Sequence, residues 1–388
     1  MNLIFVALDN RDDPTSIGPS LKIKQQCEAL EFNGINVYEL IVKNKAIYIR
    51  NGEEIKKIYD FKNKSVIEGN ESIFLRKLKI LRRMKEIFDI LIDYIKSEKI
   101  ETAYVRNLLP WNYFAVKFIK KLRKIEKVVI LDVPTYPYDK ELSKINLILD
   151  SFYNKHLKGK IDFIVTTSDE SKIYGIKAIK ITNGIDVKRY KLKRKIEKED
   201  EINLIGVANV SPWHGYDRVI RGLKEYYKDS PNVKVFFHIV GEGRGLNNLK
   251  ALTKNLGLTE YVIFHGYKTG ERLDEIFDIS NIAIGSLGLH RIGLLKSSTL
   301  KLREYCARGI PFIFSSTDED FEESFEFMFR VPSDESPINI KEILNFYKHI
   351  KNKNYPSLMR SYAERKLSWN NKMKKIVDEL KKVLDNMN

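Results

Sequence analysis

The chain of 388 residues is long enough for two domains, because a single hydrophobic core rarely grows beyond roughly 250–300 residues. Its composition, 43% hydrophobic and 31% charged, is that of a globular protein and excludes the disordered class. The two cysteines, Cys27 and Cys306, exclude a disulfide framework and a multi-cysteine zinc site, and no run approaches the roughly 18–20 apolar residues that span a bilayer. We therefore expect a reduced, cytoplasmic protein.

The chain is strongly basic, with 68 Lys and Arg against 52 Asp and Glu and a net charge of +16. This balance favours an anionic partner: nucleic acid, an anionic membrane surface or a phosphorylated substrate. A general bias of the composition toward Lys, Ile and Asn would raise the charge in the same way, so the position of the cations has to decide between the two explanations.

The first half predicts alternating strands and helices. Met1–Leu8 indicates a buried strand rather than a signal peptide, because it has no basic leader and is followed at once by charged residues. Ser20–Phe32 predicts a helix, Ile35–Val42 a strand, and Phe74–Lys96 a long amphipathic helix. Further strands are predicted at Thr102–Val105, Val128–Val133 and Phe163–Thr167. Such alternation is typical of parallel βαβ units in a doubly wound sheet.

A charged segment divides the sequence. Lys188–Glu201 has almost no apolar residue to bury and predicts a linker, after which strands and helices alternate again from Ile202 to Phe314. We therefore expect an α/β protein of two Rossmann-like, doubly wound domains, 1–187 and 202–365, with a C-terminal helix, 366–388, that completes the first domain. Its ligand is expected in the cleft between the halves, beyond the carboxyl ends of the strands.

The residues from Lys296 onward predict an anion site. Three small hydroxylated residues, 297–299, begin a helix whose unpaired N–H groups and positive dipole end can bind an anion, and Lys296 and Lys301 add positive charge. Glu304 follows about one and a half turns later, where its carboxylate can accept hydrogen bonds from vicinal hydroxyls. A plain N-cap with an exposed glutamate is the alternative interpretation of the same spacing.

Residues Lys301–Pro311 follow the pattern Lys-Leu-x-Glu-Tyr-x-Ala-x-Gly-x-Pro, which resembles the nucleotide-sugar signature of the GT-B glycosyltransferases of glycosyltransferase family four. The resemblance implies that Glu304 holds the nucleotide ribose. It also implies that backbone amides hold the donor diphosphate, namely those of Ser297, Ser298, Thr299 and Leu300. The glutamate that touches the donor hexose in the family is replaced here by Lys296, so the identity of the donor sugar stays open.

Further stretches carry the same resemblance. Asn183–Asp186 is similar to the Asn-Gly-x-Asp that closes the first domain of the family, and Gly206–Asp217 resembles a stretch whose Arg and Lys grip the donor phosphates. Asn209 and His214 stand at or near those two cationic positions. Binding of the donor phosphates is therefore expected to depend on other cations as well. We assign catalytic roles to His214, Lys296 and Arg291, and we place Lys301 and Asn209 on the donor side.

Two strand-end loops complete the expected donor site. Val240–Gly243 and Phe264–Tyr267 match loops of the family, of which the second lines the base, and they contribute Gly243 and Tyr267. On the acceptor side, the loop Leu131–Asp139 and the turn at residues 104–106 resemble the capsule and cell-surface polysaccharide branch. They supply Arg106, Tyr136 and Asp139.

The signals for a metal or a dinucleotide are weak. Gly241–Gly245 lacks the GxGxxG spacing, and the six histidines show no metal-ligand spacing. Asp318–Asp320 has the form Asp-x-Asp, but its acidic surroundings favour a solvated loop. We therefore expect no metal and no cofactor besides the sugar nucleotide.

The predicted helix at Phe74–Lys96 carries six cations before its first acid, Glu86, and Lys117–Lys127 forms a second basic stretch. These patterns favour an anionic membrane surface, although a core-facing helix with a solvated basic back explains them too. No module for nucleic acid is present in the sequence.

The resemblance implies a glycosyltransferase that moves a sugar from a nucleotide-sugar donor to a glycan or lipid-linked acceptor. Retention of configuration, independence of metal and a role in cell-surface polysaccharide biosynthesis at the inner face of the membrane are further expectations. A nucleotide-sugar epimerase built of two similar halves, or a non-catalytic protein that binds the nucleotide sugar, remains an alternative.

Overall fold

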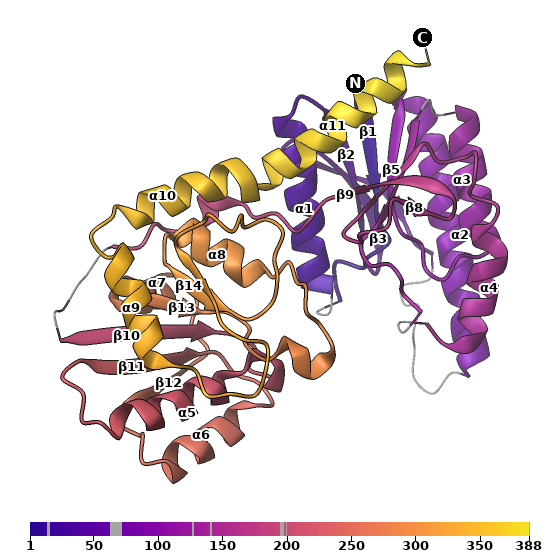
Figure 1. Ribbon diagram of the computed structural model, residues 1–388. Coiled ribbons are helices and arrows are strands. Elements are labelled where there is room, and N and C mark those ends of the chain that lie inside the picture. Colours follow the sequence, from indigo (N-terminus) through magenta and orange to yellow (C-terminus); the bar gives the residue numbers. More distant parts are fainter. Residues whose placement is uncertain are drawn as a thin grey trace. The chain divides into compact units, whose positions relative to one another are not determined.

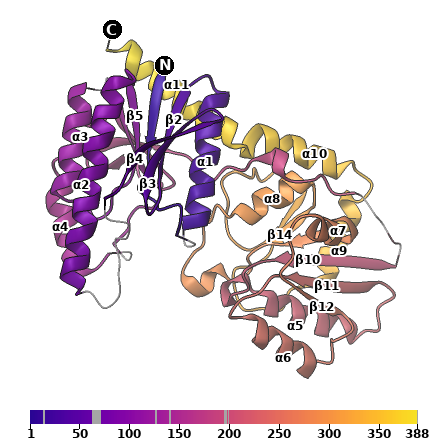
Figure 2. The same ribbon diagram turned by 180° about the vertical axis from the view of Figure 1, so that it is seen from behind.

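The computed structural model describes residues 1–13, 16–62, 72–125, 128–139, 142–194, 198 and 200–387 (Figures 1 and 2). The chain forms two compact units. Unit 1 consists of Met1–Thr182 and Trp369–Asn388, and unit 2 of Asn183–Ser368. Each unit has its own sheet with helices on both faces, which confirms the predicted fold of two Rossmann-like domains. Within the described parts of the chain, no helix is long and apolar enough to cross a membrane.

Unit 1 contains a nine-stranded sheet in the order β4-β3-β2-β1-β5-β6-β7-β9-β8. Its strands are β1 (Asn2–Val6), β2 (Asn36–Val42), β3 (Ala46–Asn51), β4 (Glu54–Asp60), β5 (Thr102–Arg106), β6 (Val128–Val133), β7 (Phe163–Thr166), β8 (Lys172–Ile173) and β9 (Ile176–Lys180). The six strands from β2 to β9 that form the centre are parallel, whereas β3, β4 and β8 are antiparallel additions. The sequence did not predict the hairpin of β3 and β4, because β4 is a largely exposed edge strand with few apolar residues.

Five helices cover the sheet of unit 1: α1 (Ile17–Phe32), α2 (Ile73–Ser97), α3 (Tyr113–Ile125), α4 (Lys144–Asn154) and α11 (Trp369–Asp385). The carboxyl half of α2 and the buried face of α3 form one core, in which Phe88 stacks on Phe118. Helices α1 and α11 pack on the opposite face. The C-terminal helix therefore returns to the first unit and buries Trp369 and Met373 there.

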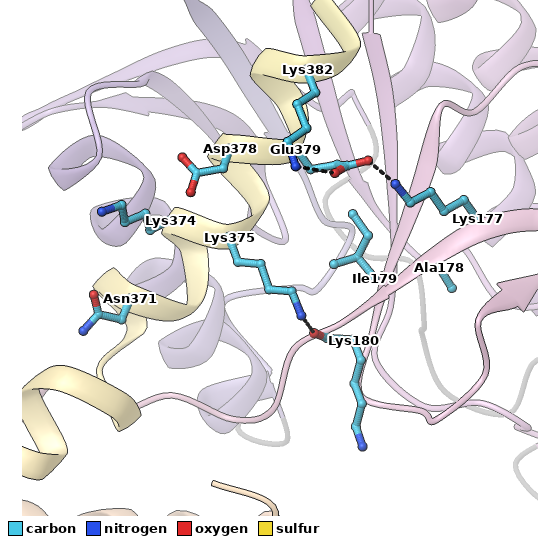
Figure 3. A pocket seen from close by; sticks show the side chains of 10 residues that line it. All are labelled: Lys177, Ala178, Ile179, Lys180, Asn371, Lys374, Lys375, Asp378, Glu379 and Lys382. Atoms are coloured by element: carbon cyan, nitrogen blue, oxygen red, sulfur yellow. Dashed lines mark hydrogen bonds and ion pairs between the residues drawn. The ribbon is translucent and has the colours of Figure 1, made fainter.

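A basic groove lies between α11 and β9 in unit 1 (Figure 3). It encloses about 560 Å³ and is lined by five lysines: Lys177, Lys180, Lys374, Lys375 and Lys382. Glu379 forms ion pairs with Lys177 and Lys382, and the Lys375 ammonium donates to the Lys180 carbonyl. These bonds fasten the last helix to the sheet, so we interpret the groove as part of the packing of α11.

Unit 2 contains a six-stranded parallel sheet in the order β12-β11-β10-β13-β14-β15. Its strands are β10 (Glu201–Val207), β11 (Lys234–Val240), β12 (Val262–Gly266), β13 (Ile282–Ile284), β14 (Phe312–Phe314) and β15 (Met328–Arg330). Its helices are α5 (Tyr216–Tyr227), α6 (Leu246–Asn255), α7 (Glu271–Ile279), α8 (Leu300–Arg308), α9 (Ile340–Ile350) and α10 (Tyr355–Tyr362). In chain order the sheet reads 3-2-1-4-5-6, the order of dinucleotide-binding sheets.

The segment predicted as a linker, 188–201, lies partly outside the described residues, at 195–197 and 199. Its described part is joined to unit 2, since Lys193 is buried and its backbone N–H donates to the Arg308 carbonyl. The chain changes units at Thr182 and again after Ser368. Close to these two crossings, the backbone N–H of Ile185 donates a hydrogen bond to the Leu367 carbonyl.

Candidate functional site

The order of the strands in unit 2 places the candidate site. Strands β10 and β13 are neighbours, but the chain leaves β10 toward β11 on one side and β13 toward β14 on the other. Ligands of such sheets bind beyond the carboxyl ends of the strands at this switch point. The loops that begin after Val207 and after Ile284 therefore form the centre of the site, and they contain His214, Arg291 and the start of α8.

Glycines let the strand-end loops approach each other closely. A Cβ atom at Gly241 would lie 1.9 Å from the Ala208 carbonyl oxygen, and one at Gly243 would lie 2.4 Å from the Val210 oxygen. Both glycines also have positive φ angles, of 122° and 142°. The backbone after β10 bonds to the loop after β11, with Val210 N–H donating to the Glu242 carbonyl. Asn209 is exposed at this junction, beside the predicted donor residue Gly243.

His214 ends a short 3₁₀ turn, Pro212–His214, just before α5. Its Nδ1 accepts a hydrogen bond from the Ser211 N–H at 3.0 Å, so Nε2 carries the proton of the neutral ring. The side chain is buried, and burial followed by the charge of Lys301 lowers its pKa to about 3. His214 can therefore donate a hydrogen bond to a ligand oxygen at neutral pH, but it supplies no positive charge there.

The amino end of α8 lacks the side-chain capping bond that usually satisfies its N–H groups. Thr299 is the N-cap residue, yet its hydroxyl makes no capping bond, and its Oγ1 atom is buried without a hydrogen-bond partner. The first turn contains no acidic residue. Ser298 is fixed instead by Asn183, whose N–H donates to the Ser298 hydroxyl at 3.0 Å and whose side chain donates to the Ser298 carbonyl at 2.9 Å. The positive end of α8 is therefore held in place and left unneutralised.

Lys301 brings a second unneutralised charge to the same helix end. Its ammonium donates to the Tyr216 hydroxyl at 3.3 Å and lies 5.5 Å from the centre of that ring. Burial lowers its pKa to about 7, although the nearby Glu304 opposes this effect. In the described part of the chain, no carboxylate forms an ion pair with it. A lysine at the amino end of a helix is also disfavoured by the helix dipole, so the arrangement is unfavourable for the protein alone and favourable for an anion.

Glu304 lies one turn after Lys301 on α8. Its Oε1 accepts from the Arg308 Nε at 2.8 Å, and Arg308 is held in turn by Asp274 at 2.5 Å. The Glu304 side chain is 21% exposed. Its orientation is therefore fixed by Arg308, while part of the carboxylate is open to a ligand hydroxyl.

Arg291 is bound by protein groups through all five of its N–H donors. It makes two bonds of 2.9 Å to Asp217, two bonds to Glu335 and one bond of 2.7 Å to the Pro212 carbonyl. The hydrogen bonds to Glu335 and Asp217 raise its pKa. Arg291 joins the loop after β13 to the start of α5, and in this arrangement it has no donor left for a phosphate. Its predicted catalytic role would require these bonds to open.

The remaining donor-side residues are more exposed. Ser297 is linked to Ser316 through their hydroxyls at 2.6 Å. Tyr267 is 73% exposed and Leu300 is 59% exposed, and Lys296 is exposed as well. The backbone of Lys296 pairs with Thr317, which fixes its position before α8. The catalytic role predicted for Lys296 stays a prediction.

The acidic residues 318–320 do not form the solvated loop that the sequence favoured. Asp318 is buried, and its carboxylate binds Arg303 at 2.5 and 2.9 Å. Burial opposes the charge of Arg303, but Asp318 and Asp320 outweigh this effect and raise its pKa. The guanidinium also donates to the Asn183 and Thr299 carbonyls, each at 3.0 Å. This buried ion pair positions the loop that leads into α8.

Among the residues that the structure describes, no group of three or more His, Cys, Asp or Glu side chains is arranged to hold a metal ion. His238 is buried in β11 and bonds to His265 at 2.9 Å and to Asn203 at 2.8 Å, so it belongs to the core, as its position in a strand suggested.

In unit 1 the predicted acceptor residues lie at the end of β5 and in the loop after β6. Arg106, the last residue of β5, forms an ion pair of 3.1 Å with Asp132 of β6. Burial raises the pKa of Asp132 and lowers that of Lys22, and each group opposes the shift of the other. Tyr136 is half-buried against Tyr138 and Tyr174, and Asp139 is exposed.

A mainly apolar cavity of about 260 Å³ opens beside the ends of β1 and β2. Its walls include Leu8, Val42 and Met84, with Asn10 and Arg83 as polar groups. It lies in the unit that is expected to bind the acceptor.

The structure therefore brings His214, Lys301 and Glu304 together around the start of α8, and places Asn209 beside Gly243. The sequence did not identify Tyr216, whose hydroxyl accepts a hydrogen bond from the Lys301 ammonium. It also did not identify the electrostatic interaction of Lys22 with Asp132 in unit 1. Tyr216 was within the stretch that resembled the phosphate-binding loop, but nothing in the local pattern showed that its ring is buried under α8.

Residues 188–326 match the family Glycosyl transferases group 1. No curated protein sequence matches the chain significantly. The fold is similar to that of a glycosyltransferase from Rickettsia africae, with a TM-score of 0.63 and 13% identity over 99% of this chain and 98% of that chain. Sucrose-phosphate synthase from Thermosynechococcus elongatus gives a TM-score of 0.62 and 14% identity over all of both chains. The structure of HepE from Anabaena in complex with UDP gives a TM-score of 0.59 and 11% identity over 98% of this chain and 100% of that chain.

These matches confirm the resemblance to GT-B glycosyltransferases. The match to the family covers most of the site described above, from the linker through the start of α8 to Asp318. At these low identities the similarity to solved structures establishes the fold and leaves donor and acceptor open.

Proposed function

We propose that this protein is a glycosyltransferase that moves a hexose from a nucleotide-sugar donor, bound at the switch point of unit 2, to a glycan or lipid-linked acceptor. The observation that carries the proposal is the half-buried Lys301 ammonium at the amino end of α8, where the N-cap side chain makes no capping bond and, among the residues that the structure describes, no carboxylate forms an ion pair with it. A diphosphate at this position would satisfy the α8 amides, the ammonium and the Nε2 proton of His214 together.

The proposed chemistry follows from where negative charge develops. The leaving nucleoside diphosphate gains charge as the bond to the sugar breaks, and preorganised donors stabilise that charge most strongly when they are already buried. Lys301 and the α8 amides would serve this role, with His214 as a neutral donor. Glu304, oriented by Arg308, would accept from the ribose hydroxyls. We propose that the reaction needs no metal, because these groups can neutralise the diphosphate. We also propose that it retains the configuration of the sugar, as the resemblance to glycosyltransferase family four implies.

The proposed acceptor side is unit 1, with Arg106, Tyr136 and Asp139 at the ends of β5 and β6. We propose a role in the biosynthesis of a cell-surface polysaccharide at the inner face of the membrane. The structure of HepE with UDP supports uridine diphosphate sugars as the first donors to test.

The test is the release of free nucleoside diphosphate from UDP-, GDP- and dTDP-sugars, measured with the purified protein in the presence and absence of glycan acceptors. We expect slow hydrolysis of one donor, acceleration by an acceptor, and no loss of rate with a metal chelator. Anomeric couplings of the product in NMR spectra report retention or inversion.

The controls separate the alternatives. Lys301→Met should abolish most turnover, whereas Lys254→Met, which changes an exposed lysine of α6 in the same unit, should leave it unchanged. A new nucleotide sugar formed without acceptor would identify an epimerase instead. Binding of a donor without any turnover would favour the non-catalytic alternative.

A further inference from the structure

Helix α4 of unit 1 carries its apolar side chains on the side that faces solvent. Ile145, Ile148, Leu149 and Phe152 are 68%, 71%, 47% and 60% exposed. They recur at steps of three and four residues and so form one stripe along the helix. The buried residue of α4 is Asp150. A helix on the face of a sheet normally buries its apolar stripe, so α4 is turned the opposite way.

Polar bonds hold α4 in this orientation. The Asp150 carboxylate accepts from the backbone N–H of Trp111 at 2.8 Å and from the Tyr138 hydroxyl at 2.7 Å. Turning the helix to bury its apolar stripe would remove both bonds and leave the buried backbone N–H of Trp111 without this acceptor, which is costly. The outward position of the stripe is therefore built into the packing of unit 1.

The surface around the stripe is positively charged. Between residues 142 and 161, all of which are described, the basic side chains are Lys144, Lys155, His156, Lys158 and Lys160, and the one acid is the buried Asp150. The neighbouring helix α3 exposes Lys117, Lys120 and Lys124 and contains no acid. Figures 1 and 2 show α3 and α4 on the same face of the sheet of unit 1.

We propose that the exposed face of α4 docks on a membrane surface that contains anionic lipids. The four apolar side chains would enter the boundary between headgroups and acyl chains, and the lysines on both ends of the helix would bind lipid phosphates. A second copy of the chain is a poor partner, because a two-fold contact through α4 would set these lysines against their own copies. The inference names the element responsible for the membrane association and rests on that part of the proposed function.

The location differs from the one that the sequence favoured, the basic helix α2. In the structure, Arg83 of α2 donates to the Lys43 carbonyl and stacks on Phe61, and Lys85 pairs with Asp89. Part of the basic charge of α2 is thus bound within unit 1, whereas the apolar stripe of α4 is exposed in the described part of the chain.

The test compares binding of the full-length protein to vesicles of neutral phosphatidylcholine with binding to vesicles that also contain phosphatidylglycerol, by flotation. We expect binding to the anionic vesicles that falls with salt. The double variant Ile148→Ser with Phe152→Ser should lose this binding by about tenfold or more, because two large side chains no longer enter the lipid. The matched control, Phe32→Ser with Ile55→Ser, removes two equally exposed apolar side chains elsewhere in unit 1 and should bind as the unchanged protein does.

Three results would overturn the proposal. The α4 variant could bind anionic vesicles as well as the unchanged protein does, or binding could be lost only in the α2 variant Lys77→Glu with Arg82→Glu. The unchanged protein could also be an oligomer that ignores anionic vesicles and becomes monomeric when α4 is substituted. Release of nucleoside diphosphate into water, measured without vesicles, should be the same in the α4 variant. Failure of that reaction would count against the glycosyltransferase function. Failure of vesicle binding would count against α4 as the membrane-docking element.

Discussion

Replacing Lys301 by Met tests the proposed donor site most directly, because the ammonium is removed while most of the apolar side chain is kept. With a pKa of about 7, Lys301 is mostly charged at pH 6 and largely neutral at pH 8.5. A bound diphosphate would hold the charge and restore the pKa toward its usual value near 10.4. Above pH 7 the protein therefore takes up a proton at Lys301 when the donor binds, and the affinity for the donor must fall as the pH rises.

The size of this effect follows from linkage. Between pH 6 and pH 8.5 the protonated fraction of free Lys301 drops by about 30-fold, which corresponds to about 2 kcal/mol of donor binding. His214 does not contribute to the slope, because its pKa of about 3 keeps it neutral across this range. At pH 6, loss of the charged bond in Lys301→Met should weaken binding by about 1.5–3 kcal/mol.

Isothermal titration with the sugar nucleotide, at several pH values and in two buffers of different ionisation enthalpy, measures both affinity and proton uptake. We expect donor affinity to fall with rising pH in the unchanged protein and in the control Lys254→Met. In Lys301→Met this pH dependence should be lost. The Met variant should also have a higher Tm at pH 7. Burial lowers the pKa of Lys301 in the folded protein, so its charge destabilises the fold most strongly at and below about pH 7, and this penalty is lost as the pH rises from about 7 to 10. A donor affinity that is independent of pH in the unchanged protein, or a slope that survives in Lys301→Met, would refute the assignment.

Three further predictions concern the same unit. Glu304→Gln should weaken nucleotide-sugar binding by roughly 1.5–3 kcal/mol without loss of the fold, measured by thermal shift, and unchanged affinity would remove the ribose assignment. Lys296→Ala should lower kcat more than donor affinity if its ammonium meets the developing charge of the diphosphate; full activity would leave it as surface, and a loss confined to acidic donors would assign it to a sugar carboxylate. Asp318→Asn should reduce the free energy of unfolding by about 3–5 kcal/mol in urea, because it removes the buried carboxylate that binds Arg303 through two nitrogens and leaves Asp320 as its partner; a change below 1 kcal/mol would show that Asp320 alone compensates the charge.

The sequence alone predicted the two parallel sheets and the positive end of α8. Both depend on local periodicity: alternating apolar runs and helical stripes define βαβ units, and the position of Glu304 relative to the start of α8 is fixed by the helix itself.

Only the tertiary structure decided what the charged side chains bind. Arg291 was a candidate for the phosphate until the structure placed Asp217 and Glu335 around it, 74 and 44 residues away. Asp318 belonged to an acidic run, and yet it is buried with Arg303. Ion pairs of this kind depend on contacts between distant segments, and a local pattern contains no information about them.

The orientation of α4 has the same origin. Its residues have a clear apolar stripe, and periodicity defines that stripe without stating which side packs on the sheet. The buried bonds of Asp150 to Trp111 and Tyr138 turn the stripe outward. The shift in the pKa of Lys301 likewise comes from burial, and its ammonium contacts Tyr216, 85 residues away. Desolvation is a property of the surrounding packing and is not encoded in the neighbouring residues.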